Sequence, residues 1–304
     1  MTGINTIVKY GCMSDEQRWD ANRYKWEWLR ELEPDDKEIA KLLDCLADGE
    51  YSGQASVAQT YELMMKAKEE GYPKELLDDW GEFLSYSNII AYEETRHGLS
   101  VGLINHYACH GNLDYFEHLT VRDYSRKYIW CYEDRRYWNL YSYALAHLFA
   151  EVVNTELYKD MRPQIKHPKF KEVITNIMKD EARHIRAWLS VIKNIVDADE
   201  YHKKCFLDEL DCGLNYHNAM VHETYFEGQN KMMRFFVSSK NGEPGTIERI
   251  INTKYTLLNT LFGEDNPYSF AQVKENHYAF LARTRGKKRA VFSEEVEGSI
   301  CFID

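Results

Sequence analysis

Two pentapeptides, EETRH at 93–97 and DEARH at 180–184, share the pattern [DE]-E-x-R-H. A bare Glu-x-x-His pair is weak evidence, but this composition predicts the five-residue pattern only about 0.01 times by chance. In a helix, the i, i+3 spacing places the second Glu and the His of each copy on one face. Each pentapeptide is therefore predicted to offer a carboxylate and an imidazole to one metal ion.

The second copy lies on a stretch with helical apolar spacing. Glu181 and His184 fall between Ile174, Ile177 and Trp188, which mark the predicted core-facing side. Acids in such positions are predicted to be buried.

Two single acids, Glu62 and Glu151, also stand where an apolar residue belongs. Together with Glu94 and Glu181 they make four buried carboxylates, each costing several kcal/mol if left unpaired. Two divalent ions would balance the four charges. Imidazole nitrogens favour iron or manganese over magnesium or calcium, although ligand type alone also permits zinc.

Proline spacing indicates which elements position these residues. Pro73 and Pro163 bound one long stretch without proline, and Pro168 and Pro244 bound another, so both stretches can form long helices. Gly71 and Gly111 mark helix ends. We predict a bundle of two helical hairpins joined by a crossover at 113–132, with outer helices beside it. The hairpin helices are 52–70 with 74–110 and 133–160 with 168–196, and the outer helices are 203–237 and 245–262.

The motifs resemble those of the ferritin-like di-iron oxygenases and oxidases. Within that superfamily they are similar to those of soluble acyl-carrier-protein desaturases and of hydroxylase subunits of bacterial multicomponent monooxygenases. The stretch EETRHG at 93–98 is especially close to the desaturase form, and the match covers about 60–190. The resemblance implies an all-α, ferritin-like four-helix bundle core with additional N- and C-terminal helices. It also implies two iron ions, with manganese as an alternative, and six metal ligands: Glu62, Glu94, His97, Glu151, Glu181 and His184.

The resemblance assigns roles to residues beside the ligands. The acid before each ligand Glu orients the opposite histidine, which implies that Asp180 supports His97 and that Glu93 supports His184. Arg96 and Arg183 are predicted either to brace these acids or to lie at the surface.

Other positions separate the branches of the superfamily. Thr155 lies four residues after Glu151, where the multicomponent hydroxylases carry a Thr thought to relay protons. Asn154 stands where the desaturases carry theirs. Val101 occupies the place of the radical Tyr of ribonucleotide reductase small subunits, so a stored tyrosyl radical is disfavoured. The additional His of arylamine N-oxygenases is replaced by Ile177, and His147 is the alternative candidate for an extra ligand.

The implied function is O₂ activation for two-electron oxidation of an organic substrate, with hydroxylation first and desaturation second. N-oxygenation of an amine, a ferroxidase, iron-storage or peroxide-scavenging function, and a metal-bearing scaffold without turnover stay open. The chain has no dinucleotide-binding fingerprint and no iron–sulfur Cys pattern, so electrons are expected from an external reductase or ferredoxin, or from the substrate itself. Substrates under consideration include an acyl chain on a carrier protein, and a homodimer is expected.

Composition limits the class of protein. The chain has 304 residues, a net charge of −11 and a mean hydropathy of −0.58. No apolar run nears the ~18 residues of a membrane span, no signal peptide is recognisable, and the negative charge disfavours nucleic-acid binding. Seven Cys without a CxxC pair are expected to be reduced in the cytoplasm. We expect one domain over 1–304, with its core at about 52–196, covering helices at 1–50 and 197–265, and a tail at 266–304.

Overall fold

The structure is a computed structural model that describes residues 3–51, 53–72, 74–114, 131–132, 139–215, 219–220, 245–283, 290–292 and 300–302. These residues are helical apart from turns, connecting segments and two small antiparallel ribbons. In one ribbon, β1 (Cys131–Tyr132) pairs with β2 (Ala219–Met220), and Cys131 lies opposite Met220. In the other, β3 (Ala290–Phe292) pairs with β4 (Ile300–Phe302). The predicted all-α class is confirmed.

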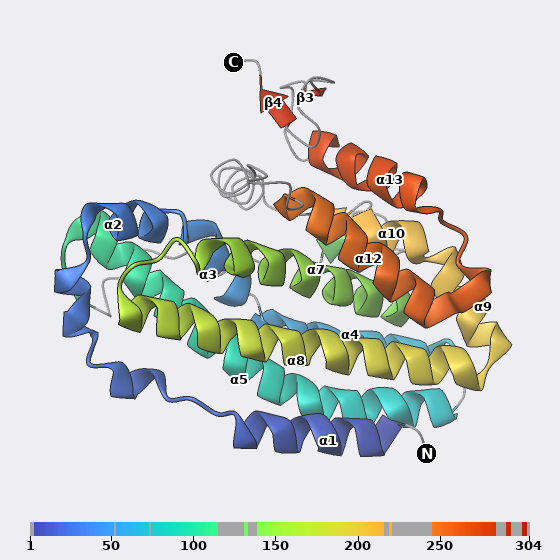
Figure 1. The fold of residues 1–304 in the computed structure, drawn as a ribbon. Helices are drawn as coiled ribbons and strands as arrows, with labels where there is room; N and C mark the ends of the chain where they lie inside the picture. The colour runs from blue at the N-terminus through green and yellow to red at the C-terminus, as the bar shows by residue number, and fades with distance from the viewer. Residues whose placement is uncertain are drawn as a thin grey trace.

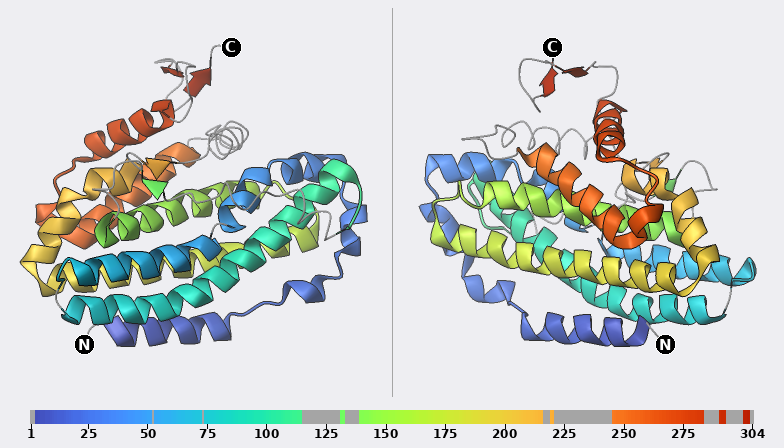
Figure 2. Two further views of the ribbon diagram at one scale, coloured as in Figure 1. Left: turned by 180° about the vertical axis from the view of Figure 1, so that it is seen from behind. Right: turned by 45° about the vertical axis from the view of Figure 1, so that its right-hand side comes forward.

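Two helical hairpins form the centre of the fold (Figures 1 and 2). In the first, α3 (Asp44–Tyr51) and α4 (Gly53–Glu69) both pack along α5 (Lys74–His110). In the second, α7 (Leu140–Met161) packs along α8 (Pro168–Ala198). Contacts of α5 with α8 and of α4 with α7 join the two hairpins into one bundle.

Local sequence signals set the ends of these helices. Gly71 and Gly111 adopt the left-handed conformation, with φ of 77° and 73°, two residues after the end of α4 and one residue after the end of α5. Asn139 caps the start of α7 by accepting a hydrogen bond from the backbone N–H of Ser142 at 2.9 Å. Pro168 occupies the first position of α8, where its missing N–H costs nothing.

Further helices cover the bundle. On one side α1 (Gly3–Glu16) packs against α5 and α8, and Figure 1 shows it below them. On the other side α12 (Thr246–Phe262) packs on α7 and α8, and α10 (Leu210–Asn215) packs on α7. The remaining outer elements are η1 (Ala21–Tyr24), η2 (Trp26–Glu31), α2 (Pro34–Lys41), α9 (Glu200–Asp208), η5 (Gly263–Asp265) and α13 (Phe270–Arg283).

The observed boundaries differ from the predicted ones in three places. The core begins earlier than residue 52, because α3 packs along α5 as closely as α4 does. The stretch predicted as one helix at 203–237 begins as two short helices, α9 and α10, and most of its remainder lies outside the described residues. The predicted tail at 266–304 contains α13. Most of the predicted crossover at 113–132 also lies outside the described residues.

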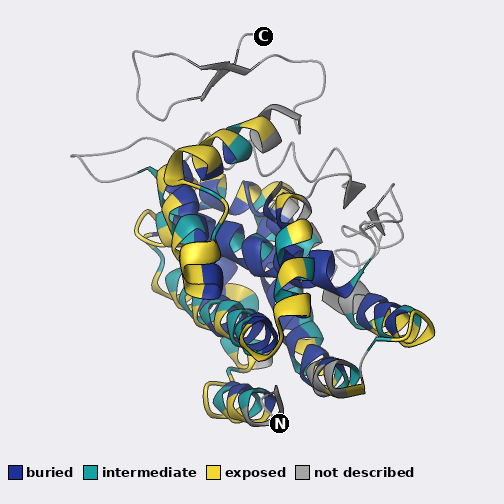
Figure 3. Cartoon of the chain, turned by 90° about the vertical axis from the view of Figure 1, so that its right-hand side faces the viewer, coloured by how far each residue is buried: buried dark blue, intermediate teal, exposed yellow. Residues whose placement is uncertain are grey.

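The two helices of the second hairpin are buried to different extents. In α7 nearly every residue is buried, from Leu140 to Tyr158, as expected for a helix enclosed on all sides. In α8 the buried residues form one stripe, and Lys179 and Arg186 lie on its exposed side. Figure 3 shows the buried residues gathered between the helices. Across the described residues, no helix combines the length and the apolar character that crossing a membrane requires.

Asp36 fixes the connection that leads into α8. Its side chain is fully buried, and its two oxygens accept hydrogen bonds from the backbone N–H groups of Lys166 and His167, both at 2.8 Å. The neighbouring Asp35 is exposed and pairs with the exposed ammonium of Lys166 at 2.6 Å. Asp36 therefore ties α2 to the start of α8 through buried, charge-assisted hydrogen bonds.

We predict that Asp36→Ala lowers the free energy of unfolding by about 3 kcal/mol, because two backbone donors lose their acceptors. Urea denaturation of the purified chain measures the change. Asp35→Ala is the matched control and should cost less than about 1 kcal/mol, as an exposed ion pair does. Equal costs for the two variants would contradict the assignment.

Candidate metal centre

Six buried side chains form two groups that share two carboxylates. One group consists of Glu50, Glu94, His97 and Glu181, and the other of Glu94, Glu151, Glu181 and His184. Within each group the candidate ligand atoms lie within 4.8 Å of one another. Because Glu94 and Glu181 belong to both groups, the arrangement offers two adjacent ion positions with two shared carboxylates.

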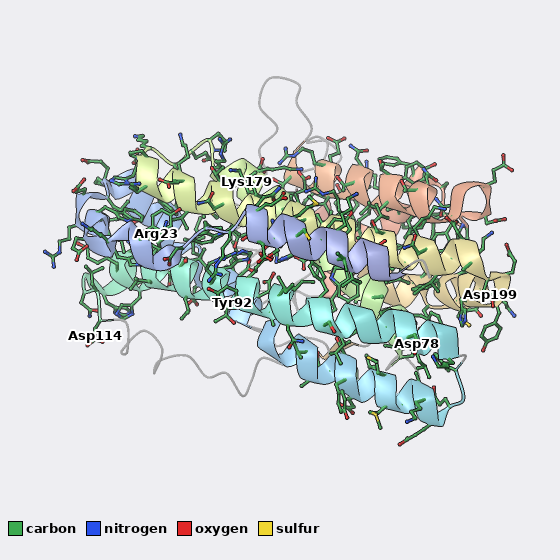
Figure 4. The ribbon with its side chains drawn as sticks, turned by 90° about the horizontal axis from the view of Figure 1, so that it is seen from below. Arg23, Asp78, Tyr92, Asp114, Lys179 and Asp199 are labelled. Carbon is green, nitrogen blue, oxygen red and sulfur yellow. The ribbon has the colours of Figure 1, made fainter. Side chains whose placement is uncertain are left out.

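Helices of both hairpins supply these residues. Glu50 comes from α3, Glu94 and His97 from α5, Glu151 from α7, and Glu181 with His184 from α8. Tyr92 and Lys179, the exposed residues just before the two pentapeptides, lie at about the same point along the bundle when it is viewed from below (Figure 4). The two pentapeptides therefore meet at one level of the bundle.

Both imidazoles turn the same nitrogen toward the carboxylates. His97 Nδ1 lies 3.2 Å from Glu50 Oε2 and 3.6 Å from Glu181 Oε1. His184 Nδ1 lies 3.0 Å from Glu94 Oε1, 3.5 Å from Glu181 Oε2 and 3.8 Å from Glu151 Oε1. The two histidines thus occupy equivalent places on either side of the shared carboxylates.

The outer nitrogen of each imidazole faces an acid from the opposite pentapeptide. His97 Nε2 lies 3.0 Å from Asp180 Oδ2, and His184 Nε2 lies 2.8 Å from Glu93 Oε2. These are the pairs that the sequence resemblance implies. A carboxylate that accepts from Nε2–H leaves Nδ1 as the nitrogen with a lone pair, which is the form that binds a metal ion.

The two arginines of the pentapeptides are buried and bind these outer acids. Arg96 donates to Asp180 Oδ2 at 2.8 Å. Arg183 donates to Glu93 Oε1 at 2.5 Å and to Asp180 Oδ1 at 2.8 Å. Of the two predicted positions for the arginines, the structure therefore shows the one that braces the acids. Two guanidinium groups balance the two outer carboxylates, so the four inner carboxylates depend on other positive charge.

Residues before the bundle complete this outer layer. Trp19 Nε1 donates to Asp180 Oδ2 at 2.8 Å, and the guanidinium of Arg96 lies 4.6 Å from the Trp19 ring centroid. Ser14 donates to Glu93 Oε1 at 2.5 Å. Sequence reasoning treated this segment as cover only. Single Trp and Ser residues without a motif carried no signal for these contacts.

Burial and repulsion from neighbouring carboxylates dominate the electrostatics of Glu50 and Glu151. Burial, followed by the charges of Glu94 and Glu181, raises the pKa of Glu50 well above its ordinary range. Burial and the same two charges also raise the pKa of Glu151. Both shifts favour the protonated form of Glu50 and Glu151, so a divalent ion that bound here would displace protons.

The outer acids behave in the opposite way. Burial opposes the charge on Asp180, but its contact with His97 outweighs burial and lowers the pKa of Asp180. Burial likewise opposes the charge on Glu93, whereas its contact with His184 lowers the pKa of Glu93. The outer acids therefore stay ionised and hold the imidazoles in place.

Several buried inner atoms make no hydrogen bond among the described residues, although His184 Nδ1 and Glu94 Oε1 lie 3.0 Å apart, and this tests whether a metal fits. These atoms are Glu94 Oε1, both carboxylate oxygens of Glu181 and His184 Nδ1. A buried polar atom left in this state costs about 1–3 kcal/mol. Two divalent ions would give each of them a partner. Four carboxylates and two imidazoles fit iron, with manganese as an alternative.

Glu62 requires a correction. The structure places it on the exposed side of α4, outside both groups, and Glu50 takes the place expected for it. The buried side of α4 carries Leu63 and Ala67, whereas Met65, three residues after Glu62, is exposed as Glu62 is. The hairpin also explains the error, because Glu50 and Glu94 lie 22 residues before and after Tyr72 in the turn, whereas Glu62 lies only 10 before it.

A sequence signal for Glu50 exists. Leu43, Leu46, Ala47 and Glu50 follow the spacing i, i+3, i+4, i+7, and all four are buried. The acid ends an apolar helical stripe, as Glu151 and Glu181 interrupt theirs. The first bundle helix was predicted to begin at residue 52, so this stripe was not assigned to the bundle.

The other sequence candidates have these surroundings. Thr155 is buried, and its hydroxyl has no hydrogen-bond partner among the described residues. Asn154, the desaturase alternative, is only half-buried, and Val101 and Ile177 are buried. His147 belongs to neither metal group and stacks on Trp188, with ring centroids 5.1 Å apart, and burial lowers its pKa to about 3.

The fold is ferritin-like. Two helical hairpins enclose a twin carboxylate–histidine site, as the sequence resemblance to the di-iron carboxylate proteins implies.

Comparisons with solved structures found chains of an R2-like ligand-binding oxidase. One is a variant with an anaerobically reconstituted Mn/Fe cofactor, at 14% identity and a TM-score of 0.45, covering 92% of each chain. Another, with an aerobically reconstituted Mn/Fe cofactor, is 12% identical with a TM-score of 0.42, covering 92% of this chain and 91% of the other. No protein-family model and no curated protein sequence matches the chain.

We predict that Glu50→Ala lowers the metal content from about two ions per chain to one or fewer, because the group around His97 loses a ligand. Metal analysis after loading with Fe(II) without oxygen, followed by desalting, measures this content. Glu62→Ala should keep both ions, and Glu181→Ala should lose both, since Glu181 is shared. Loss of an ion from Glu62→Ala but not from Glu50→Ala would restore the original assignment.

Proposed function

We propose that this chain is a non-haem di-iron oxidase or oxygenase that uses O₂ for the two-electron oxidation of an organic substrate. The reaction we place first is hydroxylation, and desaturation is second. One observation carries the proposal: two buried ligand groups share two carboxylates, and each contains one histidine. This arrangement would hold two redox-active ions side by side, so that each could supply one electron to a two-electron reaction with O₂.

Iron ions bound here would supply the electrons and the open coordination positions at which O₂ reacts. The protein's own part is to hold the ligands and exclude water. His97, Glu181 and His184 are fully buried, so the ligands move little and the groups lie in a low-dielectric interior. Asp180 and Glu93 keep the histidines in the metal-binding tautomer through the contacts at Nε2.

Thr155 supports hydroxylation over desaturation. It lies one helical turn after Glu151 on α7, so both side chains lie on the same face of that helix. Its hydroxyl is buried and has no hydrogen-bond partner among the described residues. A hydroxyl in this state is available to donate a proton to a group bound at the metals, and we assign it that role.

Two partners follow from the proposal. The chain has no nucleotide-binding fingerprint and no iron–sulfur Cys motif, so an external reductase or ferredoxin, or the substrate itself, supplies electrons. The substrate is an organic molecule, including one attached to a carrier protein. N-oxygenation is less well supported, because His147 stacks on Trp188 and lies outside both metal groups.

We predict that the iron-loaded, fully reduced protein consumes about one O₂ per chain in a single turnover, since one pair of ions holds two electrons. An oxygen electrode and stopped-flow absorbance measure the reaction. Glu181→Ala is the control and should consume none above the rate of free iron. A wild-type chain that binds two ions but does not react with O₂ would indicate a scaffold without turnover.

Iron storage is the second candidate, because the same ligands can oxidise Fe(II). Iron loading in air separates the two functions. A catalytic centre keeps about two ions per chain, whereas a storage protein accumulates a mineral of far more than about ten. Large loading would overturn the oxygenase proposal.

We predict that Thr155→Val lowers the rate of substrate-coupled O₂ consumption roughly tenfold or more, in the range of lost proton-transfer catalysis. Metal content should stay at that of the wild type, because Thr155 belongs to neither ligand group. Thr60→Val is the control, since this buried threonine donates to Tyr143 instead. An unchanged rate in Thr155→Val would contradict the proton-donor role.

A further inference from the structure

One buried phenol reaches a candidate ligand. Tyr158 lies on α7 with no exposed surface, and its hydroxyl donates a hydrogen bond to Glu50 Oε1 at 2.7 Å. Neither the pentapeptides nor the superfamily resemblance singles out this residue.

The hydrogen bond divides the two oxygens of Glu50 between two tasks. Oε1 accepts from Tyr158, while Oε2 lies 3.2 Å from His97 Nδ1, inside the ligand group. The hydrogen bond at Oε1 restricts the rotation of this carboxylate and leaves Oε2 as the oxygen that would face an ion. The carboxylate is therefore partly ordered before an ion binds.

One helix serves both ion positions. Tyr158 follows Glu151 by seven residues, so the two side chains lie on the same face of α7, two turns apart. Glu151 belongs to the group around His184, whereas Tyr158 acts on Glu50 in the group around His97.

Glu151, the terminal carboxylate of the other group, contacts Glu181 and lies 3.8 Å from His184 Nδ1. Among the described side chains, no hydroxyl or amide donates to Glu151. Glu151 is 7% exposed and Glu94 is 6% exposed, whereas Glu50 is 1% exposed. The position beside His97 is thus closed and braced, and the position beside His184 has the less restrained terminal carboxylate.

We propose that Tyr158 is a positioning residue that makes the two ion positions unequal. By fixing Glu50, it gives the position beside His97 the higher affinity for a divalent ion. Glu151, in the position beside His184, stays free to reorient when another ligand binds. The proposal rests on the metal-binding part of the proposed function, and it concerns only the difference between the two positions.

The test is a titration of the metal-free protein with Mn(II), in which EPR detects the free ion. The wild type should bind two ions per chain in two steps. Tyr158→Phe should weaken the tighter step by about 10- to 100-fold, the usual effect of removing a partner that orients a ligand, and leave the other step within about twofold. Tyr143→Phe is the matched control. It also removes a buried hydroxyl from α7, but this hydroxyl bonds to Thr60 at 2.9 Å. It should change neither step.

Single-histidine variants assign the steps. In His184→Ala, which keeps the His97 position, adding Tyr158→Phe should still weaken binding. In His97→Ala, adding it should have no effect. If either background binds no Mn(II), the two-step titration of the intact chain decides alone.

Each result separates the two proposals. Two bound ions with both steps unchanged in Tyr158→Phe, or equally weakened, would overturn the inference and leave the metal centre standing. Failure of the wild type to bind two Mn(II) or Fe(II) ions would overturn the proposed function itself, and the inference with it.

Discussion

The repulsion between four carboxylates buried in one helical interior constrains the rest of the structure. Glu50, Glu94, Glu151 and Glu181 lie close enough that their charges oppose one another, and burial strengthens the repulsion. Only protons or cations can relieve it. The arginines are already bound to the outer acids, so the inner site is left for ions. The folded bundle is therefore most stable when cations occupy the site.

The charges of the outer acids are compensated by donors of the protein itself. Asp180 accepts from Trp19, Arg96 and Arg183 as well as facing His97. With so many donors, its charge is compensated without any ion. The segment before α2 supplies part of this compensation and is a structural component of the site, not only a cover. Its irregular path brings Trp19 to the level of the pentapeptides.

Sequence reasoning succeeded where a local rule and the tertiary structure agree. The bounds of α5 follow from a proline and a glycine, and five of the six predicted ligands lie in the two groups because a motif or an interrupted apolar stripe marks them. It failed for Glu62 because α4 carries apolar residues on more than one side, and a single acid has no motif. Residues on the two helices of a hairpin can meet only where they lie equally far from the turn. The position of the turn therefore decides between such candidates. The contacts of Trp19 and Tyr158 join segments far apart in the chain, so no local pattern could predict them.

The outer helices explain why α7 contributes several polar residues at or near the site. In a minimal four-helix bundle α7 would have an exposed face, but here α12 covers it, tied by the ion pair of Arg249 with Glu156 at 3.0 Å and by its contact with Asp160. Enclosure on all sides removes α7 from water along nearly its whole length. A polar residue on such a helix must then find a partner or a ligand in the interior, since solvent is not available. Tyr158 finds Glu50, whereas Thr155 has no hydrogen-bond partner among the described residues, and this difference is the physical basis for giving the two residues different roles.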